Sequence, residues 1–269
     1  GRITAEVFNN GQLGGERVAM EQVQLGATAL TRTGHAVLTN LIPEMELFGL
    51  PYLFDDVDEM VSALDGELGE YLTTRMREEG LVVLGWFDYG ARSVLATRPV
   101  RTPEDMAGLR IRVQSSPIEA RAFEVFNAAP VNLPFTDLYS ALDSGVIDAV
   151  ENGPDTLYDQ RFYEVAGVFS ETAHFIQPTP LYMSAQIFEE LPSELQEAVE
   201  EAGRAAVQFI RDNQPQAVQD GIDSLEAAGT TMVMDVDRDA FQAAAESLYG
   251  EFYGEYPELE PILEEIRSN

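Results

Sequence analysis

The chain of 269 residues is 45% hydrophobic and 9% aromatic, which is enough apolar material for one large core or two smaller ones. It contains no cysteine, which excludes disulfides, thiolate metal sites and cysteine nucleophiles. Forty-seven acids against 16 bases give a formal net charge of −31, which argues against nucleic acid or an anionic membrane surface as a partner.

Short apolar segments alternate with amphipathic ones along the chain, which is the pattern of an α/β fold. The strands predicted from this pattern cover residues 3–8, 81–87, 93–96, 110–113 and 146–150. A helix is predicted to start after Thr102 and to end at Gly108, because a capping hydroxyl precedes a proline and two acids.

A second helix is predicted over residues 137–144, with Gly145 ending it and the strand 146–150 following at once. Asn152 then lies just beyond the carboxyl end of that strand. Ligands of open α/β sheets bind at such ends.

Residues 191–228 carry a nearly continuous helical pattern, with a local break expected at residues 213–215. A helix of this length is far above the mean of about 11–12 residues in globular proteins. It is too polar for a membrane and lacks sustained heptads, so we interpret it as a spine that crosses two lobes.

No arrangement of residues typical of catalysis or of transition-metal binding occurs in the sequence. The only histidines, His35 and His174, are far apart, which argues against a transition-metal site. No nucleophile elbow, phosphate-binding loop or dinucleotide fingerprint occurs. Pairs of carboxylates, as glycosidases use, do not indicate catalysis here, because any pair is uninformative in a chain with 47 acids. We therefore expect no enzyme activity, no metal and no cofactor.

Arginine is the only strong cation, so an arginine within an apolar strand needs a reason. Alternation over residues 109–113 puts Arg110 and Arg112 on one face, opposite Ile111 and Val113. A guanidinium at the strand's carboxyl end can bind a carboxylate through two parallel hydrogen bonds. The alternative, an internal salt bridge with one of the many acids, stays open on spacing alone.

Five ordered segments resemble the solute receptors of tripartite ATP-independent periplasmic (TRAP) transporters, the DctP family. They are NNGQLGGE at 9–16, LPYLF at 50–54, PEDMAGLRIRV at 103–113, DLYSAL at 137–142 and GVIDAVEN at 145–152. The resemblance runs from the first residues to the C-terminal helices. The family's opening strand and helix would lie before Gly1, together with a cleaved signal peptide.

The resemblance implies a two-lobed α/β clamp of the periplasmic-binding-protein type with a long inter-lobe helix. Lobe I would comprise residues 1–89 and 178–217, and lobe II residues 90–177 and 218–269. Such a protein acts as a periplasmic monomer, which captures a small organic carboxylate and delivers it to the TRAP membrane subunits. A dicarboxylate, a uronate or other sugar acid, and a keto acid are all compatible ligands.

Carried over residue by residue, the resemblance makes Arg112 the arginine that pairs with the ligand carboxylate. Arg92 is implied to be a second arginine at that carboxylate, Asn152 the amide that completes the clamp, and Phe135 an aromatic surface for the ligand.

The resemblance also implies that Glu151 and His174 hold Arg92 in place, and that the loop of Arg32 faces the far end of the ligand. Glu46 is a candidate for binding ligand hydroxyls. The alternatives are a solvated loop arginine at Arg32 and an exposed acid at Glu46. Gly153 stands where the family usually has a proline directly after the Glu-Asn pair. The turn after Asn152 is therefore expected to differ in shape.

Two other readings stay open at this point. One is a ligand-sensing receptor that docks on a membrane signalling protein, which a neighbouring permease gene would argue against. The other is a hydrolase of carboxylated sugars, which turnover of a bound ligand would support.

The excess of acids predicts a stability that depends on salt. Self-repulsion destabilises the compact state, and salt screens it, with a Debye length of about 3 Å at about 1 M. The melting temperature should rise from low to molar salt if the chain comes from a salt-adapted source. A melting temperature independent of salt would favour the alternative, in which codon bias explains the absence of lysine.

Overall fold

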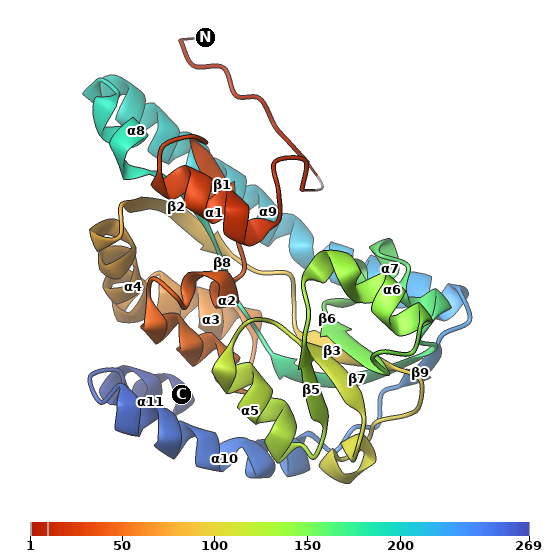
Figure 1. Ribbon diagram of the computed structural model, residues 1–269. Helices are drawn as coiled ribbons and strands as arrows, with labels where there is room; N and C mark the ends of the chain where they lie inside the picture. The colour runs from red at the N-terminus through yellow and green to blue at the C-terminus, as the bar shows by residue number, and fades with distance from the viewer. Residues whose placement is uncertain (1, 10, 269) are drawn as a thin grey trace.

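Two separate β-sheets organise the structure, a computed structural model that describes residues 2–9 and 11–268 (Figure 1). The first is antiparallel, with the strand order β1 (Leu30–Arg32), β8 (Thr179–Ser184) and β2 (Leu81–Phe87). The second has the order β5 (Ala129–Asn132), β4 (Arg110–Val113), β6 (Ala149–Asn152), β3 (Arg92–Ala96), β7 (Val168–Phe175) and β9 (Thr231–Val233). In the second sheet β3 runs antiparallel to both neighbours, whereas β5, β4 and β6 are parallel.

Helices surround both sheets. Near the first sheet lie α1 (Glu16–Gln24), α2 (His35–Leu38), η1 (Pro43–Gly49), α3 (Val57–Leu64), α4 (Glu67–Glu78) and α8 (Ala185–Glu190). Near the second lie η2 (Pro103–Met106), α5 (Pro117–Val125), η3 (Phe135–Asp137), α6 (Leu138–Asp143), α7 (Pro154–Asp159) and η4 (Phe162–Glu164). The chain ends in α9 (Ser193–Ala227), α10 (Arg238–Glu255) and α11 (Glu260–Arg267). No helix in the described ranges combines the length and the apolar character needed to cross a bilayer.

Helix α9 contacts β2 of the first sheet and, further along, α7 beside the second sheet (Figure 1). Gly203 lies so close to β2 that a Cβ at this position would come within 2.6 Å of the Leu84 Cβ. Further along, the Arg211 Nε donates to the Trp86 carbonyl oxygen at 2.9 Å. Gly221 then packs on the start of α7, where an added Cβ would lie 2.4 Å from the Asp155 nitrogen. The predicted long helix between the two halves of an α/β clamp is confirmed.

The predicted break of this helix at residues 213–215 is wrong, because α9 continues through Pro215. Side chains of this turn make hydrogen bonds of their own, one of them to α7. The Asn213 Nδ2 donates to the Phe209 carbonyl oxygen at 2.7 Å, and the Gln214 Nε2 donates to Asp155 Oδ2 at 3.2 Å. Tertiary packing therefore overrides the local signal.

Two strand predictions also need correction. Residues 2–9 form no strand, and Val7 is 76% exposed, because an alternating pattern without a neighbouring strand leaves its backbone unpaired. The strand expected at 146–150 is β6, at Ala149–Asn152. Gly145 adopts a φ of 68°, and the amides of the next two residues both donate to the Ala141 carbonyl, which keeps them in the closing turn of α6. Asn152 is consequently the last residue of the strand.

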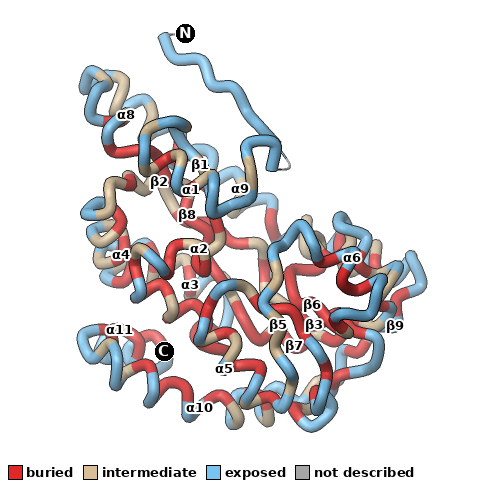
Figure 2. Tube along the Cα trace, in the orientation of Figure 1, coloured by how far each residue is buried: buried red, intermediate tan, exposed pale blue. Residues whose placement is uncertain are grey.

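The largest apolar cluster joins the two sheets, and Figure 2 shows the buried trace running between them. Phe48 of η1 packs on Trp86 of β2 with ring centroids 6.4 Å apart, and the same cluster includes Phe123 of α5. A second cluster, around Leu95 and Phe169, involves the second sheet and its helices.

The exact lobe ranges, 1–89 with 178–217 and 90–177 with 218–269, stay a prediction. The C-terminal helices, predicted to belong to lobe II, also contact the first half of the chain. The Tyr249 hydroxyl of α10 donates to the Pro51 carbonyl oxygen at 2.8 Å.

Two glycines in helices provide a matched test of the close contact between α9 and α7. Gly221→Ala forces a methyl group against the backbone of Asp155, so we expect a loss of about 1–3 kcal/mol of stability. Gly250→Ala in α10 meets no atom within 4 Å and should stabilise the protein by about 0.5–1 kcal/mol. Melting curves of both variants measure the difference, and equal shifts would contradict the packing described.

Candidate functional site

Strand β6 places two polar side chains between two arginines. It lies between β4 and β3, with Ile111 opposite Ala149 on one side and Ser93 opposite Asn152 on the other. The end of β6 that carries Glu151 and Asn152 therefore lies near Arg112 on β4 and Arg92 on β3. This brings together four of the residues singled out in the sequence.

Arg92 is bound by Glu151 through both of its carboxylate oxygens. The Arg92 Nε donates to Glu151 Oε2 at 2.6 Å, and its NH2 donates to Oε1 at 2.7 Å. The NH2 group also donates to the Glu151 carbonyl oxygen at 3.1 Å. The side chains are 11% and 0% exposed, so this is a buried, bidentate ion pair.

His174 lies against the same carboxylate. Its Nε2 is 3.7 Å from Glu151 Oε2, and its Nδ1 is 2.8 Å from the Thr172 hydroxyl. Burial opposes the ionisation of Glu151, but the charge of Arg92 together with the hydrogen bonds of His174 and Arg92 lowers the pKa of Glu151 to about 2. Burial lowers the pKa of His174 as well, so its imidazole is neutral at physiological pH. Glu151 thus contacts Arg92 directly, and His174 contacts Glu151; their role in holding Arg92 for a ligand stays a prediction.

Asn152 keeps its amide donors available. Its Oδ1 accepts from Arg92 NH1 at 3.3 Å and from the Gly153 nitrogen at 2.9 Å. No acceptor for its Nδ2 occurs in the described part of the chain, although the residue is only 8% exposed. Arg92 therefore orients the amide, and the amide's N–H groups remain for another partner.

Arg112 has no carboxylate partner of its own. It is 6% exposed, and its Nε donates to the Leu133 carbonyl oxygen at 3.0 Å. Within residues 2–9 and 11–268, no acidic oxygen lies within 4.0 Å of its guanidinium; Arg98 shares this property but is solvent-exposed. The internal salt bridge considered for Arg112 is instead made by Arg110, whose NH2 is 2.6 Å from Asp148 Oδ1.

Phe135 follows the segment that Arg112 holds through Leu133. It begins η3, is 40% exposed, and packs edge-on against Phe162 with centroids 6.1 Å apart. An exposed aromatic face near a buried guanidinium suits a ligand with both apolar and anionic parts. Its contact with a ligand stays a prediction.

The other two predicted contacts lie outside this cluster. Arg32 pairs with Glu16 at 3.0 Å and lies over the Tyr89 ring at 5.4 Å. Glu46 of η1 accepts from the Ser116 hydroxyl at 2.6 Å and from the Ile118 nitrogen at 3.1 Å. Its Oε2 is thus committed to the start of α5, which leaves less of the carboxylate for a ligand. The ligand roles of both residues stay predictions.

A buried polar group that the sequence did not point to lies close by. Glu119, in the first turn of α5, is 0% exposed and accepts hydrogen bonds from Gln114 and Gln177. His35 of α2 contacts it, with its Nε2 3.4 Å from Glu119 Oε1. The spacing from Ser116 to Glu119 is that of a helix cap, which predicts an exposed acid, so no local signal marked this residue.

A concavity of about 400 Å³ exists elsewhere, between the loop after η1 and the last two helices. Acids line it, including Asp55, Glu59 and Glu246, and its arginine, Arg267, is paired with Glu246 at 2.7 Å. It is therefore unsuited to an anion. No cluster of three potential metal ligands occurs among the residues that the structure describes.

Two ion pairs in the second sheet allow the buried pair to be tested against a control. Glu151→Gln leaves the charge of Arg92 buried without compensation, so we expect a loss of about 3–5 kcal/mol of stability. Asp148→Asn removes a pair whose arginine is 45% exposed, and the loss should be much smaller. Chemical denaturation of both variants at pH 7 measures this difference. Equal losses would show that the buried ion pair contributes no more to the free energy of unfolding than the exposed one.

Comparison with known proteins identifies the family. Residues 1–255 match the family described as "Bacterial extracellular solute-binding protein, family 7" (DctP). A solute-binding protein of Chromohalobacter salexigens is 32% identical over 269 residues, which cover 100% of this chain and 80% of the relative. The 2,3-diketo-L-gulonate-binding periplasmic protein YiaO of Escherichia coli is 32% identical over 245 residues, which cover 91% of this chain and 75% of the relative.

Solved structures share the fold. A TRAP periplasmic solute-binding protein of Chromohalobacter salexigens with bound D-glucuronate has a TM-score of 0.95 at 31% identity, covering 99% of this chain and 89% of that one. One from Xanthobacter autotrophicus with bound β-D-galacturonate has a TM-score of 0.93 at 33% identity, covering 100% and 89%. The chain therefore belongs to the DctP family, whose members are the solute-binding proteins of TRAP transporters.

Proposed function

We propose that this chain binds a hexuronate or a closely related sugar acid through Arg112 and delivers it to the membrane subunits of a TRAP transporter. The observation that carries the proposal is the state of Arg112. Its guanidinium is buried, yet no acid of the described residues pairs with it in a chain that has 47 acids. A buried charge without a partner is costly, so the site gains most from an anion supplied by a ligand.

The donors that remain free match a carboxylate. Arg112 offers its terminal N–H groups in a planar fork, and Asn152 offers its Nδ2, held in place through Arg92. Each hydrogen bond to a charged group contributes about 1.5–3 kcal/mol net. In this arrangement Arg92 orients the amide and adds positive charge, while Glu151 and His174 hold Arg92.

The choice of a sugar acid is supported by the relatives. The solved structures from Chromohalobacter salexigens and Xanthobacter autotrophicus contain glucuronate and galacturonate, and the Escherichia coli protein is named for 2,3-diketo-L-gulonate. All three are six-carbon sugar acids. Dicarboxylates and keto acids are the alternatives that a binding screen would reveal.

In this proposal the ligand lies between lobe I and lobe II, with Phe135 from lobe II and Arg32 and Glu46 from lobe I nearest to its sugar part. The protein acts as a monomer outside the cytoplasm after removal of a signal peptide. The ligand is bound and released unchanged, without a catalytic step. Closure of the lobes would exclude water and strengthen the hydrogen bonds to the carboxylate.

A thermal-shift screen against small carboxylates, followed by calorimetric titration, tests the role of Arg112. A ligand at about 100 times its dissociation constant should add about 2.7 kcal/mol of stability. Arg112→Lys keeps the charge but loses the planar fork, so affinity should fall. Arg112→Ala should lose about 3–5 kcal/mol of binding free energy, a hundredfold or more in dissociation constant.

Arg98→Ala is the matched control, because Arg98 also lacks an ion pair among the described residues but is exposed and donates only to the Ala107 carbonyl oxygen, at 2.7 Å. Its affinity should equal that of the unmodified protein, and all three variants should stay folded. Near-native affinity in Arg112→Ala would end the proposal.

A further inference from the structure

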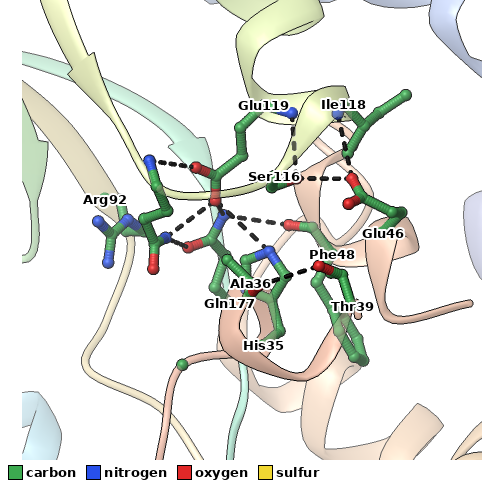
Figure 3. Close-up of polar contacts among 12 residues, drawn as sticks. His35, Ala36, Thr39, Glu46, Phe48, Arg92, Ser116, Ile118, Glu119 and Gln177 are labelled. Carbon is green, nitrogen blue, oxygen red and sulfur yellow. Dashed lines mark hydrogen bonds and ion pairs between the residues drawn. The ribbon is translucent and has the colours of Figure 1, made fainter. Parts of the chain in front are cut away.

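Glu119 is a buried carboxyl group whose hydrogen-bond donors are all neutral (Figure 3). Its Oε1 accepts from Gln114 Nε2 at 2.9 Å and from Gln177 Nε2 at 2.8 Å, and its Oε2 accepts from the Gln114 nitrogen at 3.1 Å. The side chain is therefore held firmly. None of these donors neutralises a negative charge on it.

His35 approaches Glu119 from α2, next to the first sheet. Its Nε2 lies 3.4 Å from Glu119 Oε1 and has no hydrogen-bond partner in the described chain, although the residue is 1% exposed. Burial, followed by the charge of Arg92, lowers the pKa of His35 to about 3, so the imidazole is neutral. A neutral imidazole with its proton on Nδ1 presents Nε2 as an acceptor. A protonated Glu119 would supply the missing donor.

The charged groups that face Glu119 can be counted. Arg112 on β4 and Arg92 on β3 are positive, and Glu151 on β6 is negative. With Glu119 ionised, the two positive and two negative charges cancel, so a ligand carboxylate would leave one excess negative charge. With Glu119 protonated, the cluster carries one positive charge, which a single carboxylate neutralises.

Acids on the neighbouring elements have partners of their own. Glu46 of η1 is bonded to the start of α5, and Glu16 of α1 is paired with Arg32. On α10, Glu251 contacts Arg121 at the surface, 3.4 Å away. His174 on β7 is neutral, because burial lowers its pKa.

Glu151 cannot take up the proton, because the charge of Arg92 and the hydrogen bonds of His174 and Arg92 together lower its pKa to about 2 against the effect of burial. Glu119 differs: burial, and then the charge of Glu151, raise its pKa to about 7. Protonated and ionised forms of Glu119 therefore coexist near neutral pH. Another anion nearby favours the protonated form further.

We propose that Glu119 takes up a proton when the ligand carboxylate binds at Arg112, and that the protonated carboxyl group then donates a hydrogen bond to His35. This rests on the proposed function of Arg112 and adds a proton to the binding equilibrium. The balanced step is uptake of one proton from solvent on the Glu119 carboxylate, with no other bond formed or broken. The contact also joins α5, which lies beside the second sheet, to α2, which lies beside the first. Proton uptake would therefore favour the arrangement in which these two helices are in contact.

The sign of the pH dependence follows from linkage. Below about pH 6, Glu119 is protonated with and without ligand, and affinity should be constant. Above about pH 7, the free protein must acquire the proton, so affinity should fall by up to about tenfold per pH unit. The fall ends where Glu119 also ionises in the complex.

Titration calorimetry with D-galacturonate or D-glucuronate tests this directly. At pH 8, measurements in two buffers with different ionisation enthalpies should show uptake of up to about 0.9 proton per ligand bound. Binding without proton uptake, and with an affinity unchanged from pH 6 to 9, would overturn the inference and leave the proposed function standing. If no small carboxylate binds at all, both fall. This measurement uses the unmodified protein and needs no variant to fold.

Glu119→Gln assigns the proton to its residue, because glutamine resembles the protonated acid. The variant should bind at pH 8 as tightly as the unmodified protein does at pH 6, without proton uptake. A merely structural role would lower its melting temperature and leave proton uptake intact, which would contradict the inference. The control is Asp88→Asn, which removes another buried acid, one that accepts from the Gly90 nitrogen and faces Arg211. It should keep the pH dependence of the unmodified protein.

Discussion

The ion pair between Arg92 and Glu151 determines which charge remains available in the second sheet. Glu151 uses both oxygens on Arg92, so Arg92 is neutralised within the protein and serves as a fixed support for Asn152. Arg112, two strands away in the same sheet, is then left with a carbonyl group as its only hydrogen-bond partner among the described residues. Removing Glu151 would leave both Arg92 and Arg112 buried without an ion pair, so the free charge of Arg112 depends on the paired charge of Arg92.

Strands of the second sheet and the positions of its arginines could be predicted from the sequence, but the long-range contacts of these strands and side chains could not. Alternation around Arg112 and the helix start at Thr102 are local patterns, and the structure has the strand and the capping box at these places. Residues 3–8 alternate equally well and form no strand, because alternation reports a side-chain period and says nothing about a neighbouring strand. The motif resemblance pointed to Arg92, for which no local pattern would have sufficed, whereas Asn152 also stood out at the end of a predicted strand.

Glu119 shows most clearly why the rest could not be predicted. Its place three residues after Ser116 predicts an acid at the exposed start of a helix, but η1 closes over that start. The close approach depends on Gly49, where a Cβ would lie 2.2 Å from Ile118 Cγ2. A glycine far away in the sequence thus helps to turn a surface acid into a buried one, and this burial is the main cause of the raised pKa of Glu119.

An anion-binding protein with a net charge of −31 repels its own ligand at long range. Salt limits that repulsion, because the Debye length is about 8 Å at physiological ionic strength, and charges on distant surfaces are screened. Recognition must therefore come from groups in direct contact with the ligand, where burial weakens screening. The cluster around Arg112 holds two arginines, one firmly ionised acid and one acid that ionises near neutral pH. Protonation of Glu119 removes one negative charge, so the binding site becomes positive although the protein around it stays strongly negative.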